Sequence, residues 1–429
     1  MRIVREGISV GLGQVASALG ALVGIRLLTE FMQPATFGTL SLLMGVAVLA
    51  QGFSTTPLTQ SVLRFYPACA NNSTTGHLRR ISVRAVLGIC AAVGVILLVG
   101  WYFWRARYGG SVWTGAILAV MLMVDGLRAL EVTLLNAARR QSPMALWIGL
   151  EAWLRPLVAV LVVFWVGESA ESVLVGYLGA SLGLFLLFRI ALGTIPGLAE
   201  GSDGTAPRES DLANRMTRYA LPLVPLALVG WISAQADRYL IGGMIDLAAA
   251  GIYSAMYGLV SRPFLLAGTA VELTLRPVLY QAIADGNEQK ARLVEHRWLY
   301  ALVAVSALGT AGFMLLHQVL STLLLAESYR DYSYLMPWLA VGYSFLVVAQ
   351  FYERLCYARD KTAAGLTIQT AGAIASIIIA IPLVSRYGIE GAAVAVPCYF
   401  LFQMMLARAM ARKAAPGRAP TFRSDPRQQ

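Results

Sequence analysis

The chain has 429 residues, of which 58% are hydrophobic and 13% are charged, and its formal net charge is +11. A soluble domain could not bury so much apolar surface, and continuous apolar runs of about 20 residues exclude a β-barrel, whose strands alternate. The sequence therefore predicts an all-α polytopic membrane protein. Most of the positive charge lies in short loops beside the apolar runs, where Lys and Arg orient membrane helices, so it does not indicate a nucleic-acid partner.

Twelve apolar segments follow one another along the chain. We expect membrane helices near residues 8–31, 37–60, 81–104, 112–136, 143–166, 172–195, 217–242, 247–279, 297–319, 332–355, 363–384 and 389–411. A polar stretch rich in Gly, Ser and Pro separates the sixth segment from the seventh, which is typical of a flexible linker. The predicted organisation is an N-terminal six-helix bundle over residues 1–195, a cytoplasmic linker over 196–216, a C-terminal six-helix bundle over 217–411 and a disordered basic cytoplasmic tail over 412–429.

The basic content of the loops alternates, and this alternation predicts the orientation of the chain. One side carries the larger set, namely Arg2, Arg5, Arg79, Arg80, Arg139, Arg140, Arg208, Arg215, Lys290, Arg292, Arg359, Lys361 and the basic residues of the tail. The opposite side carries only Arg105, Arg107, Arg330 and Arg386. The positive-inside rule therefore predicts that both termini lie in the cytoplasm. The first apolar segment is too long for the hydrophobic region of a signal peptide, so we expect no cleavable signal.

The two halves of the chain resemble each other at their first hairpins. Residues 27–41 match residues 240–254, because in each a helix ends, a short turn follows, and a glycine opens the next helix. A weaker match pairs residues 138–141 with residues 358–361. Six helices per half place both halves in the same orientation, so the halves are expected to be related by a pseudo-two-fold axis along the membrane normal. Transporters built in this way bind their substrate between the halves.

Three motifs resemble those of the polysaccharide and O-antigen flippases. Gln33–Gly38 is similar to the P-x-x-F/Y-G turn after that family's first helix, and residues 236–241 with 249–255 are similar to its seventh and eighth helices. Residues 386–395 are similar to its Y-G-I-x-G-A-A turn before the last conserved helix. The family belongs to the multidrug/oligosaccharidyl-lipid/polysaccharide exporter superfamily. The resemblance implies a bacterial inner-membrane flippase for undecaprenyl-pyrophosphate-linked oligosaccharide, with membrane lipid and other polysaccharide-assembly proteins as further partners.

Six arginines inside apolar segments are candidates for binding an anionic substrate: Arg26, Arg128, Arg155, Arg189, Arg238 and Arg262. An ionisable side chain at membrane depth is costly and usually faces a bundle interior or a watery cavity. The guanidinium fork matches phosphate, so these arginines would suit a pyrophosphate or an acidic sugar on a path between the halves. Arg189 and Arg262 have the weakest local explanation, whereas Arg26 lies four residues before Glu30 and could instead pair locally.

Four carboxylates inside the segments are candidates for ion coupling: Asp125, Glu131, Glu151 and Asp237. Asp125, Arg128 and Glu131 lie on nearly one helical face, where they either neutralise one another or form a proton or cation site. The chain carries no nucleotide-binding motif, so we expect a proton or sodium gradient to drive transport.

Two further pairs of charged residues are close in sequence. Glu151 and Arg155 have i, i+4 spacing, and Pro156 after them permits a kink. Asp237 and Arg238 are adjacent on a helix and point about 100° apart, so at least one of them is expected to meet another helix.

No catalytic triad, phosphate-binding loop or metal cluster is found in the sequence, so we expect no enzymatic activity, catalytic residue, bound metal or cofactor. The alternatives are a multidrug exporter or a peptidoglycan-precursor exporter of the same superfamily. A multidrug exporter would need carboxylates for cationic drugs, and the first helix offers Arg26 instead. A membrane glycosyltransferase would need a carboxylate constellation on an outer loop, where only Glu327 and Asp331 lie near each other.

Overall fold

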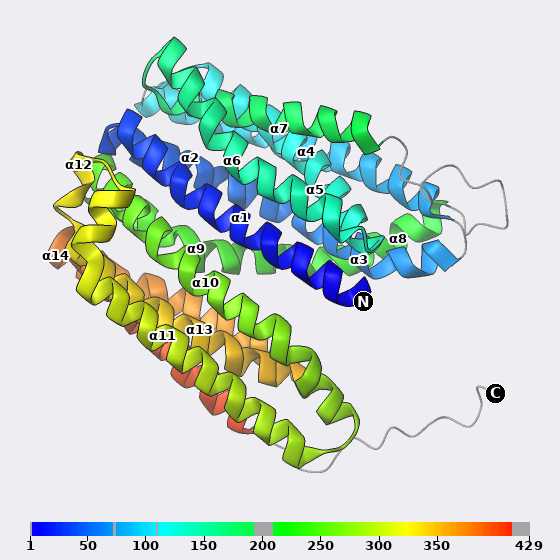
Figure 1. Ribbon diagram of the computed structural model, residues 1–429. Helices are drawn as coiled ribbons and strands as arrows, with labels where there is room; N and C mark the ends of the chain where they lie inside the picture. The colour runs from blue at the N-terminus through cyan, green and yellow to red at the C-terminus, as the bar shows by residue number, and fades with distance from the viewer. Residues whose placement is uncertain (1, 72–73, 109, 193–208, 414–429) are drawn as a thin grey trace.

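The computed structural model describes residues 2–71, 74–108, 110–192 and 209–413, and helices are the only regular structure in these ranges (Figure 1). In chain order the elements are α1 (Arg2–Phe31), α2 (Pro34–Ser54), α3 (Thr56–Asn71), α4 (Thr75–Tyr108), α5 (Trp113–Ala137), α6 (Gln141–Val166), α7 (Ala170–Leu192), α8 (Glu209–Ala220), η1 (Leu221–Leu223), α9 (Val224–Met244), α10 (Leu247–Ala284), α11 (Glu288–Leu324), α12 (Glu327–Arg330), η2 (Ser333–Leu335), α13 (Met336–Ala358) and α14 (Thr362–Lys413).

The described helices confirm the predicted all-α membrane fold. Nine segments of the described chain are long and apolar enough to cross a membrane. The long helices α5 and α10 are not among these nine, and both carry charged side chains within their apolar sequence. The last element, α14, is two helices joined at Gly388, where φ is +59°. Because this conformation strains residues with a Cβ, a glycine allows the break where the sequence predicts a boundary between the last two helices.

The second predicted membrane helix, near residues 37–60, is interrupted toward its C-terminal end, between α2 and α3. The Ser54 hydroxyl donates to Ala50 O at 2.7 Å, and the Thr56 hydroxyl donates to Gln51 O at 3.3 Å. Such side-chain bonds compete with the helical backbone, and Pro57, next in sequence, disfavours helical geometry in the residue before it. The interruption therefore has a local cause that hydropathy alone does not reveal.

Helix α8 occupies the end of the predicted linker. Residues 209–216 of that linker are helical, whereas its earlier residues and the tail from residue 414 lie outside the described residues. The Tyr219 ring lies edge-on to the Phe65 ring of α3, with centroids 6.0 Å apart, and Arg215 Cζ lies 5.5 Å from the same ring. The seventh membrane helix is thereby connected to the N-terminal half through α8 and α3.

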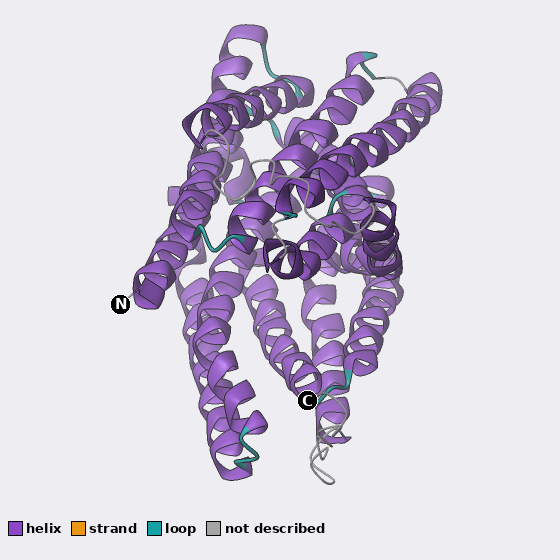
Figure 2. Cartoon of the chain, turned by 90° about the vertical axis from the view of Figure 1, so that its right-hand side faces the viewer, coloured by secondary structure: helices purple, strands orange, loops and turns teal. Residues whose placement is uncertain are grey.

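The membrane helices form two groups, α1–α7 and α9–α14, called here the N-half and the C-half. Helix α2 packs on both α9 and α10, and α1 packs on α10 and α11. Figure 1 shows the two groups converging near α12 and diverging toward the opposite end. Figure 2 looks at the molecule from that diverging end and shows that both groups are helical.

The halves approach each other closely where α2 crosses α10, at two glycines that are equivalent in the sequence repeat. A Cβ built on Gly38 would lie 1.9 Å from Leu247 O, and a Cβ built on Gly251 would lie 1.9 Å from Pro34 O. The two contacts are reciprocal, because Gly38 matches Gly251 and Pro34 matches Leu247 in the repeat. The pseudo-two-fold axis therefore passes through this crossing.

Hydrogen bonds extend the contact on either side of the glycines. The Ser41 hydroxyl donates to the Ser254 hydroxyl at 2.7 Å, and these two serines are also equivalent in the repeat. Tyr239 OH on α9 donates to Leu42 O at 2.6 Å. Helix α2 is thus bonded to two helices of the C-half.

The short helix α12 contacts the turn between α1 and α2 at the same end of the molecule. Tyr329 OH donates to Met32 O at 3.0 Å, and the Ala326 amide donates to the Thr29 hydroxyl at 3.3 Å. The Tyr329 ring also lies edge-on to Phe37, with centroids 6.0 Å apart. The turn between α1 and α2 is therefore bonded to the C-half at this end of the molecule.

We predict that Gly251→Ala lowers the stability of the protein. The new Cβ would meet a backbone carbonyl that cannot move aside cheaply, and overpacking of this kind costs about 1–3 kcal/mol. The measurement is the melting temperature in detergent, with Gly312→Ala as the control, because a Cβ at Gly312 meets nothing within 4 Å. An equal melting temperature for both variants would contradict the close crossing.

Candidate functional site

A cavity of about 350 Å³ lies between the two halves, next to the crossing of α2 and α10. The N-half contributes wall residues from α1, α2, α6 and α7, and the C-half contributes residues from α9 and α10. Three of the six candidate arginines line it: Arg155 from the N-half, and Arg238 and Arg262 from the C-half. The structure thus brings together candidates from three different helices.

Small residues on α1 allow this helix to pack closely on α6 beside the cavity. A Cβ on Gly20 would lie 2.8 Å from the Trp153 side chain, and a Cβ on Gly24 would lie 3.0 Å from Pro156. Trp153 Nε1 donates to Ala16 O at 3.0 Å. Gly20 and Gly24 therefore allow α1 to pack closely on α6, and Gly24 and Ala21 also line the cavity.

The arginine of the N-half wall, Arg155, is already neutralised by carboxylates. It is ion-paired with Asp125, and its Nε lies 2.9 Å from Glu151 Oε1. Arg128 completes the cluster, with Nη1 2.6 Å from Glu151 Oε2 and Nε 3.5 Å from Asp125 Oδ1. Two carboxylates offset two guanidinium groups, so this network, called here the N-half quartet, has no net charge. Its Asp and Glu side chains are 1% and 8% exposed, which makes the pairing necessary.

The arginines of the C-half wall are not neutralised in this way. Arg238 Cζ lies 4.8 Å from the centroid of the Tyr257 ring, and Arg238 donates to the Gln235 side chain. Its Nε is buried without a hydrogen-bond partner. Among the described residues, Arg262 has no ion pair or hydrogen bond, and it lies within electrostatic range of Arg238. Two like charges that share one wall without a salt bridge favour an anion between them.

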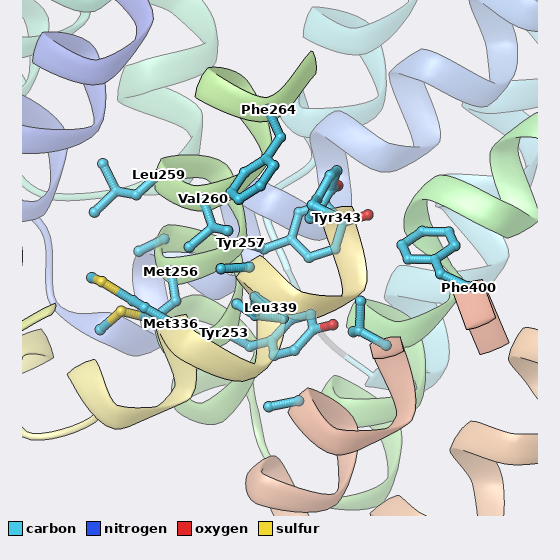
Figure 3. Packing of buried hydrophobic residues seen from close by; sticks show 14 of the residues in the cluster. Tyr253, Met256, Tyr257, Leu259, Val260, Phe264, Met336, Leu339, Tyr343 and Phe400 are labelled. Atoms are coloured by element: carbon cyan, nitrogen blue, oxygen red, sulfur yellow. The ribbon is translucent and has the colours of Figure 1, made fainter. Parts of the chain in front are cut away.

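Aromatic side chains pack next to Arg238, and Figure 3 shows three of them, Tyr253, Tyr257 and Tyr343, in the buried cluster of the C-half. The Tyr257 and Tyr343 rings pack edge to face with centroids 5.3 Å apart, and Tyr253 lies 5.7 Å from Tyr257. Tyr253 OH donates to Asp237 Oδ2 at 2.5 Å. Asp237 is thus buried in the C-half core, while its sequence neighbour Arg238 reaches the cavity.

The other candidate arginines lie elsewhere. Arg26 Nη1 is 2.6 Å from Glu30 Oε2, which is the local pairing that the sequence left open. Arg189 Nη1 is 3.3 Å from Glu131 Oε1, and Arg79 Nη2 is 2.5 Å from the same oxygen. Together with Arg128, these arginines are absent from the cavity lining. Glu131 is therefore held between two guanidinium groups and is not an isolated carboxylate.

Sequence reasoning missed several residues of the cavity. Tyr177 on α7 carries no charge and belongs to no motif, so nothing in the sequence singles it out. Ser41 and Ser254 could have been found, because they occupy equivalent positions in the repeat. Outside the cavity, the pairing of Arg79 with Glu131 is also invisible in the sequence, because it depends on the packing of α4 against α5.

The sequence profile of a family described as polysaccharide biosynthesis protein matches residues 3–283, which is well over half of the chain. The chain belongs to this family. A search of curated proteins by sequence found no match.

Solved structures show which fold this polysaccharide biosynthesis protein adopts. The lipid II flippase MurJ in an inward closed conformation matches with a TM-score of 0.75 at 12% identity, over 95% of this chain and 87% of that chain. An inward-facing MATE-family multidrug resistance transporter of the MOP superfamily matches with a TM-score of 0.68 at 12% identity, over 94% of each chain. A MOP-superfamily transporter from Pyrococcus furiosus matches with a TM-score of 0.65 at 14% identity, over 96% of this chain and 94% of that chain.

These similarities show the fold of a MOP-superfamily transporter with two pseudo-symmetric halves. At such low identity they do not assign a functional role to any residue of this chain. Family and fold together show a multi-pass helical membrane protein of a polysaccharide biosynthesis family that shares its fold with these transporters.

We predict that Asp125→Ala destabilises the protein strongly. The change leaves Arg155 and Arg128 with one carboxylate between them, and breaking a buried pair from one side costs about 3–5 kcal/mol. The double variant Asp125→Asn/Arg155→Gln keeps the cluster neutral, so it should recover most of the loss. The measurement is the melting temperature of each variant in detergent, and equal values for the single and double variants would contradict the paired arrangement.

Proposed function

We propose that the protein flips an undecaprenyl-pyrophosphate-linked anionic oligosaccharide across the bacterial inner membrane during polysaccharide biosynthesis. The head group would enter the inter-half cavity while the lipid tail stays in the bilayer, and alternating access would carry it across. Both termini would lie in the cytoplasm. The observation that carries this proposal is the pair of arginines without salt bridges, Arg238 and Arg262, on the C-half wall.

The charge of the cavity wall decides between substrate classes within the superfamily. A cationic drug would need a free carboxylate on the wall, and no carboxylate is among the cavity-lining residues in the described part of the chain. An anion meets two guanidinium groups, which match pyrophosphate oxygens in geometry and charge. A multidrug exporter is therefore the weaker alternative.

A peptidoglycan-precursor exporter remains a second candidate, favoured by the structural similarity to the lipid II flippase. The two functions differ in their cellular consequence. Loss of a polysaccharide flippase removes surface polysaccharide from cells that still divide, whereas loss of a peptidoglycan-precursor exporter causes lysis. Depletion of the protein, with polysaccharide staining and cell counts, separates them.

For ion coupling, we propose Asp237 among the four candidate carboxylates. Asp125, Glu131 and Glu151 each form salt bridges with arginines, so these carboxylates already have a structural partner. Asp237 instead accepts a hydrogen bond from Tyr253 and forms no salt bridge among the described residues. The groups around it are the hydroxyls of Tyr253, Tyr257, Tyr343 and Tyr399 and the guanidinium of Arg238. It is therefore the carboxylate best placed to exchange a proton.

We expect Arg238→Ala and Arg262→Ala each to abolish polysaccharide export while the protein stays in the membrane. Lysine at either position should restore only part of the activity, because a point charge cannot form the bidentate contact. The measurement is surface polysaccharide in a strain that lacks the native gene, with protein level by immunoblot.

The matched control for these variants is Arg276→Ala. Arg276 lies on the same helix as Arg262, but it does not line the cavity, and its Nη1 lies 2.7 Å from Glu272 Oε1. Full export in both cavity variants would rule out an anion site on the C-half wall.

We expect Arg189→Ala to lower the protein level instead of blocking transport, since Arg189 contacts Glu131 outside the cavity.

We further expect the affinity of the purified protein for farnesyl pyrophosphate to fall as pH rises through the range in which Asp237 loses its proton. An ionised Asp237 partly offsets the charge of Arg238 and so weakens anion binding. By linkage, a bound anion in turn favours the protonated form of Asp237. Asp237→Asn should bind the anion tightly at every pH, whereas Asp285→Asn, at an exposed position, should behave as wild type. A pH-independent wild type would contradict proton coupling, and a response to sodium alone would assign the coupling to that ion.

A further inference from the structure

Tyr177 lines the cavity from the N-half, whereas Arg238 and Arg262 line it from the C-half. It lies on α7 and lines the same space as Arg155, Arg238 and Arg262. Its ring centroid is 5.9 Å from Arg155 Cζ, and its hydroxyl interacts electrostatically with both Arg155 and Arg262. Among the described residues, no hydrogen-bond partner of that hydroxyl is found, so the hydroxyl is a free donor that faces cations from both halves.

The packing of α7 holds Tyr177 in this place. Gly176 is pressed against α6, because a Cβ built there would lie 2.3 Å from Ala159 Cα. One helical turn after Tyr177, the Ser181 hydroxyl accepts from Arg155 Nε at 2.8 Å and from Nη2 at 2.6 Å. Because i and i+4 share a helix face, Tyr177 and Ser181 contact the same arginine, which positions the tyrosine.

We propose that the Tyr177 hydroxyl is the N-half ligand of the anion that Arg238 and Arg262 bind, so that the bound anion links the two halves. This inference rests on the proposed function and adds to it a neutral donor from the opposite wall. Arg155 does not compete for the anion, because its charge is offset by Asp125 and Glu151. Its role is to hold Tyr177, and the tyrosine contacts the substrate.

This arrangement selects for the shape of the anion. A carboxylate has two oxygens in one plane, and a fork of two arginines on one wall can satisfy both. A pyrophosphate has oxygens that point in several directions, so it can contact the two arginines and still accept a hydrogen bond from Tyr177 across the cavity. The residue therefore distinguishes a pyrophosphate from a carboxylate of similar size.

The test compares Tyr177→Phe with wild type in the full-length protein in detergent. The probes are farnesyl pyrophosphate and farnesoic acid, a carboxylate with the same chain. A hydrogen bond to a charged group is strong enough for its removal to weaken pyrophosphate binding about tenfold, and farnesoic acid should bind equally to both proteins. Tyr102→Phe is the control, because Tyr102 is an exposed tyrosine of α4 outside the cavity.

The outcomes separate this inference from the proposed function. If Arg238→Ala and Arg262→Ala lose pyrophosphate binding but Tyr177→Phe binds like wild type, the tyrosine is not a ligand and the anion site stands. If the two alanine variants bind like wild type, the anion site itself fails. An equal loss of both probes in Tyr177→Phe, or a fall in its melting temperature, would show a structural hydroxyl and would also overturn the inference.

Discussion

The distance between the halves is set by the crossing of α2 and α10, and the site depends on that distance. At Gly38 and Gly251 the two backbones are so close that a methyl group on either would meet a carbonyl oxygen. Helices that approach this closely leave a small cavity beside the crossing, and its opposite walls carry Arg155 and Arg262. A wider crossing would move these walls apart, and no single anion could then reach both.

The two walls of the cavity differ in charge, and this difference determines which half would hold a bound anion more strongly. The N-half wall is neutral, because every arginine in its quartet has a carboxylate partner. The C-half wall is cationic, because Arg238 and Arg262 have none that forms a salt bridge in the described chain. An anion is therefore attracted mainly by one half. When the halves move relative to each other, it would travel with the C-half, and the contact with the N-half would break first.

The helices were predictable from sequence, because length and apolar composition are properties of consecutive residues. The break at Gly388 was also predictable, since a glycine within a turn motif is a local signal. Which arginines lack a salt bridge was predictable only in part, because Arg262 and Arg189 both lack a nearby acidic residue in the sequence but Arg189 is paired in the structure. Spacing rules reach four residues along a helix, so they find the pairing of Arg26 with Glu30. They cannot find that Arg189 pairs with Glu131, 58 residues away, or that Arg155 pairs with Asp125, 30 residues away.

The reciprocal contacts at the crossing are those of an isologous interface. In such an interface the same patch occurs on both partners, and residue i contacts residue j while j contacts i, as in a two-fold dimer of identical chains. Pro34 to Gly251, Leu247 to Gly38 and Ser41 to Ser254 follow this rule within one chain. At this crossing each half therefore presents an equivalent patch to the other, as the two subunits of a two-fold dimer do. The covalent chain preserves the geometry of a homodimer, while the separate sequences of its halves allow one wall to be neutral and the other cationic.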